Sequence, residues 1–337
     1  MHQYDLGRVE SVEHVPRGLI HRTYDVRSER GRFILQRLHP VLANGEMLAD
    51  MAAVTAHLAA RGLLTPCIVR TRVGELAAVD GAAWWRLTLH IGGETFDEVG
   101  DSDMAYAAGR ELGRFHAAVG DLEHVFRSRH SLHQTRRVVE LLQDVLGRDL
   151  TAAPRGAEVA ERGAAVIRSL AGRYLDGLPQ CVVHGDPKIS NVVFVPRSGQ
   201  EARRTLGLID LDTVSRHTRL VDLGDAARSW CRSGGEDERS GFLLPHFQAL
   251  LAGYSETAPP LAAAEREALA RAPAVITLEL AARFLRDCIE DAYFGWDARR
   301  YACRRDHNWA RAMGCIALAE SIGEQSGEIA RAVAAVR

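Results

Sequence analysis

The chain has 337 residues, which is enough for one large domain or two lobes with an ample core. Hydrophobic residues make up 47% of it and charged residues 26%, as in ordinary globular proteins. The formal net charge of −2 gives no indication of a nucleic-acid or membrane partner, and none of the six cysteines forms a C-x-x-C pair, which argues against a zinc site. A polar start and the lack of a long apolar run lead us to expect a cytoplasmic protein.

The first ninety residues read as an antiparallel sheet interrupted by one helix. A helical pattern covers residues 45–61 and ends at Gly62, a residue suited to a helix C-terminus. Between the first two strands, the loop over residues 16–22 contains a single glycine, Gly18. The backbone amides from Gly18 to His21 are candidates for a phosphate-binding nest. Strands are expected over residues 9–15, 22–28, 32–38, 67–73, 76–79 and 82–90.

The rest of the chain is predicted to be mostly helical. Its helical patterns leave room for short strands only around residues 181–183, 192–194 and 206–209. After these come a helix start near Asp222 and four further helical segments. The earlier helices are expected over residues 103–119, 134–148 and 157–175, and a later helical segment runs over residues 278–301.

Two short stretches carry the strongest chemical signal. In residues 182–194, an apolar run leads into His184-Gly185-Asp186, and Asn191 follows five residues after Asp186. In residues 206–213, a second apolar run ends in Asp210 and Asp212. If the two runs pair as a hairpin-like ribbon, these four polar side chains lie near one another.

Three carboxylates and an amide gathered in one place suit a bound cation. Hard oxygen ligands of this kind favour Mg²⁺, and we expect it on Asn191, Asp210 and Asp212. The remaining carboxylate, Asp186, can then accept a proton from an attacking hydroxyl, with Lys188 beside it to stabilise the transferred group. Taken singly, His184 is more often a structural histidine, and an Ile-Asp-Leu-Asp run is usually a strand end that faces water.

The order and spacing of these residues resemble the catalytic and metal-binding loops of the kinase-like fold. The His-Gly-Asp opening is similar to that of the aminoglycoside phosphotransferase and choline kinase superfamily. This resemblance implies an α+β, bilobal, protein-kinase-like fold. Its β-rich N-lobe would comprise residues 1–91 and bind the nucleotide. Its mostly helical C-lobe would comprise residues 92–337. ATP and Mg²⁺ are the implied cofactors, and a small-molecule hydroxyl compound is the implied acceptor.

The same resemblance assigns nucleotide contacts in the N-lobe. Gly18 and His21 would lie over the ATP phosphates, and the backbone near Thr88 and His90 would bind adenine. The lysine expected on the third strand is missing. Gln36 takes its register and Arg37 follows it, and only one of the two can face the cleft because side chains alternate along a strand.

The acidic partner of that lysine is also in doubt. The first helix carries only Glu46 and Asp50, so we expect the ion pair between the strand and this helix to be absent or remodelled.

Several later residues admit two interpretations. Asp222 and Asp225 either cap amides at a helix N-terminus or serve the site, Asp222 by bracing the catalytic loop and Asp225 with Arg228 by shaping the acceptor site. Residues 278–301 combine aromatic and paired charged side chains, which suits a sugar but is also typical of a solvated helix face. The candidates for acceptor binding are Asp186, Asp225, Arg228, Arg283, Asp287 and Tyr293.

Over residues 9–325 the chain resembles the N-acetylhexosamine kinase branch of that superfamily. The residues that carry this likeness include Gly18 to Tyr24, Gln36, Asp210-Leu211-Asp212-Thr213 and Tyr293-Phe294. The resemblance implies transfer of the ATP γ-phosphate to the anomeric hydroxyl of an N-acetylhexosamine or related hexose. Two alternatives stay open: an aminoglycoside or amino-alcohol phosphotransferase, and a non-catalytic protein that binds nucleotide.

Overall fold

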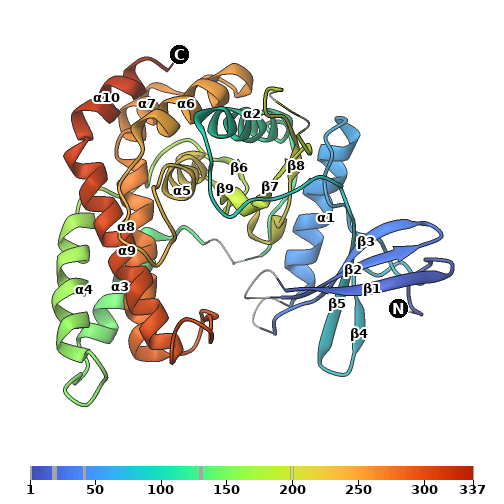
Figure 1. Cartoon of the computed structure of the whole chain (residues 1–337), viewed down its shortest axis with the longest axis horizontal. Helices are drawn as coiled ribbons and strands as arrows, with labels where there is room; N and C mark the ends of the chain where they lie inside the picture. The colour runs from blue at the N-terminus through green and yellow to red at the C-terminus, as the bar shows by residue number, and fades with distance from the viewer. Residues whose placement is uncertain are drawn as a thin grey trace.

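The N-terminal part of the molecule is a five-stranded antiparallel sheet with one helix against it (Figure 1). This computed structural model describes residues 2–16, 21–40, 43–128, 132–197, 199 and 201–336. The strand order is β1-β2-β3-β5-β4. The elements are β1 (Val9–Val15), β2 (Arg22–Ser28), β3 (Gly31–Arg37), α1 (Gly45–Ala60), β4 (Ala78–Asp80) and β5 (Ala83–Leu89).

Alternation along β3 decides which side chains face the helix. Phe33 and Leu35 are buried on one face of the sheet, in a cluster with Leu87 of β5. Gln36 therefore lies on the opposite face, the one covered by α1, whereas Arg37 is exposed. Of the two residues that the sequence left open, Gln36 is the one that contacts Arg86 on the face toward α1.

The prediction of a strand over residues 67–73 is wrong. This segment runs beside β5, where the Val69 amide donates to the Leu87 carbonyl, but it has only an isolated bridge between Ile68 and Thr88. The Thr71 amide then donates to the carbonyl of Glu75, which turns the chain away from the sheet. A strand cannot continue through that turn.

Helices make up most of the second part. Helix α2 packs along α6, and α8 packs against both α5 and α9, around a core that includes Phe115, Trp230 and Phe247. Helix α2 begins one residue before the predicted position because Asp101 caps it, accepting the Met104 amide at 2.8 Å. The helices are α2 (Ser102–Ala118), α3 (Thr135–Leu146), α4 (Gly156–Leu170), α5 (Leu220–Trp230), α6 (Leu244–Thr257), α7 (Ala263–Leu269), α8 (Ala272–Glu290), α9 (Arg304–Glu324) and α10 (Ser326–Ala334).

Two short strand pairs are inserted between the helices. Strands β7 (Val192–Phe194) and β8 (Thr205–Leu208) form a ribbon, so the run that ends in Asp210 pairs with the run after Asn191 and not, as expected, with the run that leads into His184. The preceding strand β6 (Cys181–Val183) pairs instead with β9 (Ser215–His217), a partner that the sequence did not predict. Both pairs are antiparallel, so the loops after β6 and after β8 emerge beside each other.

The C-terminal segment departs from the helix predicted over residues 278–301. Helix α8 ends at Glu290 because Asp291 adopts a left-handed conformation, with φ of 51°. Three residues before the end of α8, Asp287 accepts the amides of residues 292–294, which folds the following chain back. Residues 291–303 are therefore a loop over the end of the helix, and α9 begins at Arg304.

The overall arrangement confirms the predicted fold class. A β-rich N-terminal part and a mostly helical C-terminal part meet around the chain between β5 and α2 (Figure 1). The division into domains at residue 91 stays a prediction. No helix within the described ranges is both long and apolar enough to cross a membrane.

Candidate active site

The loop after β6 and the loop after β8 touch at Gly185. This glycine has a φ of +86°, and a Cβ atom there would lie 2.5 Å from the carbonyl oxygen of Thr213. The Thr213 hydroxyl donates to the His184 carbonyl at 2.8 Å. Only glycine combines this backbone conformation with so close an approach, so the His-Gly-Asp sequence brings the two loops together.

His184 has a structural role, which is the more common role for a single histidine of this kind. Its side chain is fully buried. Its Nδ1 atom accepts the Asp186 amide at 3.3 Å, and its Nε2 atom therefore donates to the Ile209 carbonyl at 3.0 Å. The ring thus links the segment that carries Asp186 to the segment that carries Asp210.

Asp222, at the start of α5, braces the catalytic loop. Its carboxylate accepts the His184 amide at 2.7 Å, the Gly185 amide at 2.8 Å and the His116 Nε2–H group at 2.9 Å. Burial opposes ionisation, but the His116 hydrogen bond and charge hold the pKa of Asp222 below its usual value. His116 in turn contacts the Tyr254 hydroxyl at 2.8 Å. The sequence reasoning missed both His116 and Tyr254.

Asp186 lies at the centre of the site and is held ionised. Its Oδ2 atom is 2.8 Å from the Lys188 ammonium group. Burial favours the neutral acid, but the Lys188 charge outweighs it and lowers the pKa of Asp186. Conversely, the Asp186 charge raises the pKa of Lys188. A carboxylate with a lowered pKa is a weak base, so it suits orienting a hydroxyl better than removing its proton early.

Asn191 and Asp210 form the pair that fits a metal ion. The Asn191 Nδ2 atom donates to the Asp186 carbonyl at 2.8 Å, which leaves the Oδ1 atom as the oxygen available to a cation. Among the described residues, no hydrogen bond to the Asp210 carboxylate is found. Burial and the charge of Asp212 raise the pKa of Asp210.

A divalent cation would relieve this unfavourable charge. Within the described ranges no group of three His, Cys, Asp or Glu side chains could hold a metal by itself. Mg²⁺ at phosphate-transfer sites needs only one or two protein oxygens beside the phosphates, so the residues present fit it.

Asp212, which the sequence assigned to the metal, has other partners. It forms a bidentate ion pair with the fully buried Arg86 of β5, and its Oδ2 atom lies 2.8 Å from His21 Nε2. Burial opposes ionisation, but Arg86 and His21 hold the pKa of Asp212 well below its usual range. Arg86 also donates to the Gln36 Oε1 atom at 2.6 Å. Asp212 therefore joins the loop after β8 to the N-terminal sheet, and the reasoning from sequence missed Arg86 entirely.

Two backbone amides in the segment predicted to bind adenine are hydrogen-bonded to neighbouring strands or loops. The Leu89 amide donates to the Cys67 carbonyl at 3.0 Å and the His90 amide donates to the Arg32 carbonyl at 3.1 Å. The Thr88 side chain is buried. These two amides are thus unavailable to a nucleotide in this arrangement. Gly18 lies outside the described residues.

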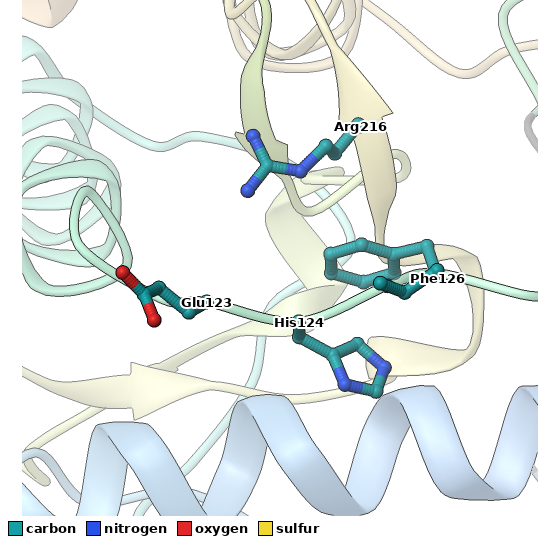
Figure 2. Close-up of a pocket in the computed structure, with 5 residues that line it drawn as sticks. Glu123, His124, Phe126 and Arg216 are labelled. Carbon is teal, nitrogen blue, oxygen red and sulfur yellow. The ribbon is translucent and has the colours of Figure 1, made fainter.

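Asp50 of α1 turns away from the strands. Its buried carboxylate accepts the Ser128 amide at 2.8 Å and lies 2.7 Å from His124 Nε2. Figure 2 shows His124 beside α1, in a pocket of about 590 Å³ that Phe126 and Arg216 also line. The expected remodelling of the strand–helix ion pair is therefore confirmed. Asp50 of α1 binds the chain around His124 and Ser128, and the carboxylate that pairs with Arg86 is that of Asp212.

Beyond Asp186 lies a group of paired charges, which we call the acceptor cluster; Asp225 and Arg228 are buried in it, whereas Arg300 is exposed at its edge. Arg228 contacts Asp225 at 2.7 Å and Glu236 at 3.0 Å. The Asp225 Oδ2 atom is buried and has no hydrogen-bond partner among the described residues. Burial raises the pKa of Asp225, and repulsion from the negative charge of Asp186 raises it further. The cluster comprises Asp225, Arg228, Glu236, Asp237, Arg300 and Arg311.

Aromatic side chains cover one edge of the acceptor cluster. Asp237 accepts the Tyr301 hydroxyl at 2.8 Å and lies 3.2 Å from His307 Nε2, and these two rings stack with their centroids 4.2 Å apart. The sequence reasoning missed Glu236, Asp237 and Tyr301. No local spacing linked them to the catalytic loop.

The three other predicted acceptor residues build a neighbouring loop. Asp287 accepts four hydrogen bonds, three from the amides of residues 292–294 and one from Asn308, which use all its acceptor positions. Arg283 lies over the rings of Tyr293 and Phe294. Asp287 therefore shapes this loop and has no free position for an acceptor molecule.

The fold and these loops together define a kinase-like small-molecule phosphotransferase. The chain belongs to the phosphotransferase enzyme family (APH), whose pattern matches residues 11–260. The homoserine kinase of Brucella anthropi is 28% identical over 280 residues, which cover 80% of this chain and 77% of that protein.

Solved structures extend the likeness of the fold over almost the whole chain. A microcompartment-associated aminopropanol kinase superimposes with a TM-score of 0.67 at 21% identity, covering 96% of both chains. An amicoumacin kinase in complex with AMP-PNP superimposes with a TM-score of 0.63 at 14% identity, covering 95% of this chain and 90% of that one. The predicted superfamily and the enzymatic nature of the chain are confirmed. The N-acetylhexosamine kinase branch stays a prediction.

Proposed function

We propose that this protein transfers the γ-phosphate of ATP to the anomeric hydroxyl of an N-acetylhexosamine or related hexose. The observation that carries the transfer is the contact of Asp186 with Lys188 at 2.8 Å, next to Asn191 and to Asp210, whose carboxylate has no hydrogen-bond donor among the residues that the structure describes. This pairing keeps an anionic hydrogen-bond acceptor next to the residues that fit a metal ion.

Each residue of the site has a separate role in phosphoryl transfer. Asp186 accepts the hydrogen bond of the acceptor hydroxyl and aims its oxygen at the γ-phosphorus. As the new P–O bond forms and the bond to ADP breaks, the hydroxyl proton passes to the Asp186 carboxylate. The Lys188 ammonium group attracts the negative charge of the moving phosphoryl group. Mg²⁺ held by Asn191 and Asp210 would neutralise charge on the nucleotide phosphates.

The acceptor cluster supports a neutral, hydroxyl-rich acceptor. It contains three carboxylates, Asp225, Glu236 and Asp237, and three guanidinium groups, which balance one another. A balanced set offers both donors and acceptors to hydroxyl and amide groups without attracting a strong cation. The Asp225 Oδ2 atom, which has no hydrogen-bond partner in the described part of the chain, is a place for one such hydroxyl.

An amino alcohol is the second candidate acceptor, and two observations favour it. The same Asp225 oxygen would suit an ammonium group, because burial leaves it without a hydrogen-bond partner. The homoserine kinase and aminopropanol kinase names of similar proteins also point to acceptors that carry an amine.

The test is ATP consumption with Mg²⁺ against a panel of acceptors, with phosphorus NMR of any product. The panel holds free hexoses, N-acetylhexosamines, homoserine, aminopropanol, ethanolamine and aminoglycosides. A sugar 1-phosphate signal is the expected result. Turnover restricted to amines would overturn the sugar assignment in favour of the second candidate. Turnover on none of them would refute both.

A further inference from the structure

Arg86 occupies the position in the sheet that faces Gln36. The two residues are direct cross-strand partners in the register of β3 and β5, so their side chains share the face covered by α1. Arg86 is 1% exposed, and Gln36 stands at the register where a lysine was expected. The guanidinium group thus brings a positive charge to that location from the neighbouring strand.

This arginine determines how the Gln36 amide is oriented. A guanidinium group can only donate hydrogen bonds, so the Gln36 atom that lies 2.6 Å from it must be the oxygen. The Gln36 NH₂ group therefore points the other way, where its nearest partner is the Thr23 hydroxyl at a long 3.4 Å. Held in this orientation, the Gln36 NH₂ group can still donate a hydrogen bond to another acceptor.

The same arginine also reaches across to the metal-binding loop. It pairs with both oxygens of Asp212, two residues after Asp210. Helix α1 contributes only the sulfur atoms of Met47 and Met51 to this guanidinium group, not a carboxylate. His21 adds a second contact from the N-terminal part to Asp212, at 2.8 Å. The position of Asp210 relative to the sheet is thus set through Arg86.

We propose that Arg86 is a positioning residue for the nucleotide. It holds the Gln36 amide so that its NH₂ group donates to a phosphate, and it holds Asp212 so that Asp210 keeps its distance from the sheet. In this role Arg86 would act through Gln36 and Asp212, because its side chain is 1% exposed and its guanidinium group is hydrogen-bonded to both. This inference rests on the proposed function only in requiring that the protein binds a nucleotide with Mg²⁺.

The test measures binding of Mg²⁺–AMP-PNP by calorimetry, which needs no knowledge of the acceptor. Arg86→Gln should weaken binding at least tenfold, because it removes the charge that pairs with Asp212, and because a glutamine both donates and accepts, so it no longer fixes which atom of the Gln36 amide faces residue 86. The double variant Gln36→Lys with Arg86→Gln moves the cation back to β3, and its affinity should return to within about threefold of the wild type. A purely structural role for Arg86 would show no such recovery.

The matched control is Arg219→Gln, which breaks another buried arginine–carboxylate pair. Arg219 lies 2.9 Å from Glu265, which comes from α7. This variant should lose thermal stability and keep its affinity for Mg²⁺–AMP-PNP.

Three results would overturn the proposal: unchanged affinity in Arg86→Gln, equal weakening in Arg219→Gln, or no recovery in the double variant. If Arg86→Gln does not fold, the double variant alone decides, since a folded double variant without nucleotide affinity contradicts the assigned role. Should the acceptor panel be silent while these binding results hold, the sugar kinase proposal fails and this inference stands.

Discussion

Replacing Asp222 by asparagine should damage both the fold and the catalytic loop. In the native protein one carboxylate oxygen accepts the Gly185 amide, and the other accepts the His184 amide and the His116 ring. Asparagine has only one oxygen, so its NH₂ group must face at least one of these buried donors. A hydrogen bond to a charged group contributes about 1.5–3 kcal/mol, and a buried donor left without a partner costs about 1–3 kcal/mol.

Together these terms predict a loss of about 3–5 kcal/mol in the free energy of unfolding. With about 2.1 cal/mol/K of unfolding entropy per residue over 337 residues, this corresponds to a fall in Tm of about 4–7 °C. The backbone of the catalytic loop would also shift, and a displacement of about 1 Å lowers kcat about 100-fold.

Differential scanning calorimetry and initial rates with the best acceptor of the panel would measure both effects. Asp121→Asn is the matched control, because Asp121 is largely exposed and its ion-pair partners among the described residues are Arg61 and His57, which lie far from the catalytic loop in sequence. Its Tm and kcat should stay at the wild-type values. If Asp222→Asn kept a wild-type Tm and a kcat within twofold of it, the bracing role of Asp222 would have to be abandoned.

Three further predictions concern the charges around the site. Asp186→Asn should fold normally, as judged by circular dichroism, and lose nearly all turnover, so near-normal activity would contradict its assigned role. Asp225→Asn should raise KM about tenfold for a neutral sugar but at least 100-fold for an amine, because only the amine loses a buried ion pair. For His133, burial lowers the pKa, but the Glu279 charge 3.0 Å away outweighs it and raises the pKa above 6.5. The stabilisation from this pair is therefore complete below pH 6.5 and is lost as the pH rises through the raised pKa. The Tm of the wild type should fall over that range, whereas the Tm of His133→Gln should not. Parallel Tm profiles of the two proteins would refute this prediction.

The catalytic loop was accessible from sequence because its geometry is local. Asp186, Lys188 and Asn191 lie within six residues of one another, after an apolar run that reads as a buried strand. The chemistry of a carboxylate, an ammonium group and an amide limits the functions that such a group can have. In the structure Asp186 contacts both Lys188 and Asn191. The alternation of side chains along β3 likewise reduced the choice to Gln36 or Arg37.

The prediction of a helix over residues 278–301 is wrong beyond Glu290, for a local reason that the composition does not reveal. The Asp287 carboxylate ends the helix by collecting the amides of the next turn, and this requires Asp291 to adopt a left-handed conformation. Its pattern of apolar residues continues past that point, so periodicity alone gave no warning. The same event turned Asp287 from an expected acceptor contact into a support for a loop.

By itself, the sequence determined the class of protein, the kinase-like fold and the short segments that carry Asp186, Asn191 and Asp210, because each depends on residues close together in the chain. Only the tertiary structure decided which buried charges pair. Asp212 and Arg86 are 126 residues apart, and their contact depends on β5 lying next to β3 and on the metal-binding loop reaching that sheet. A carboxylate removed from water takes whatever cation the fold places beside it, and the spacing along the chain carries no record of that partner.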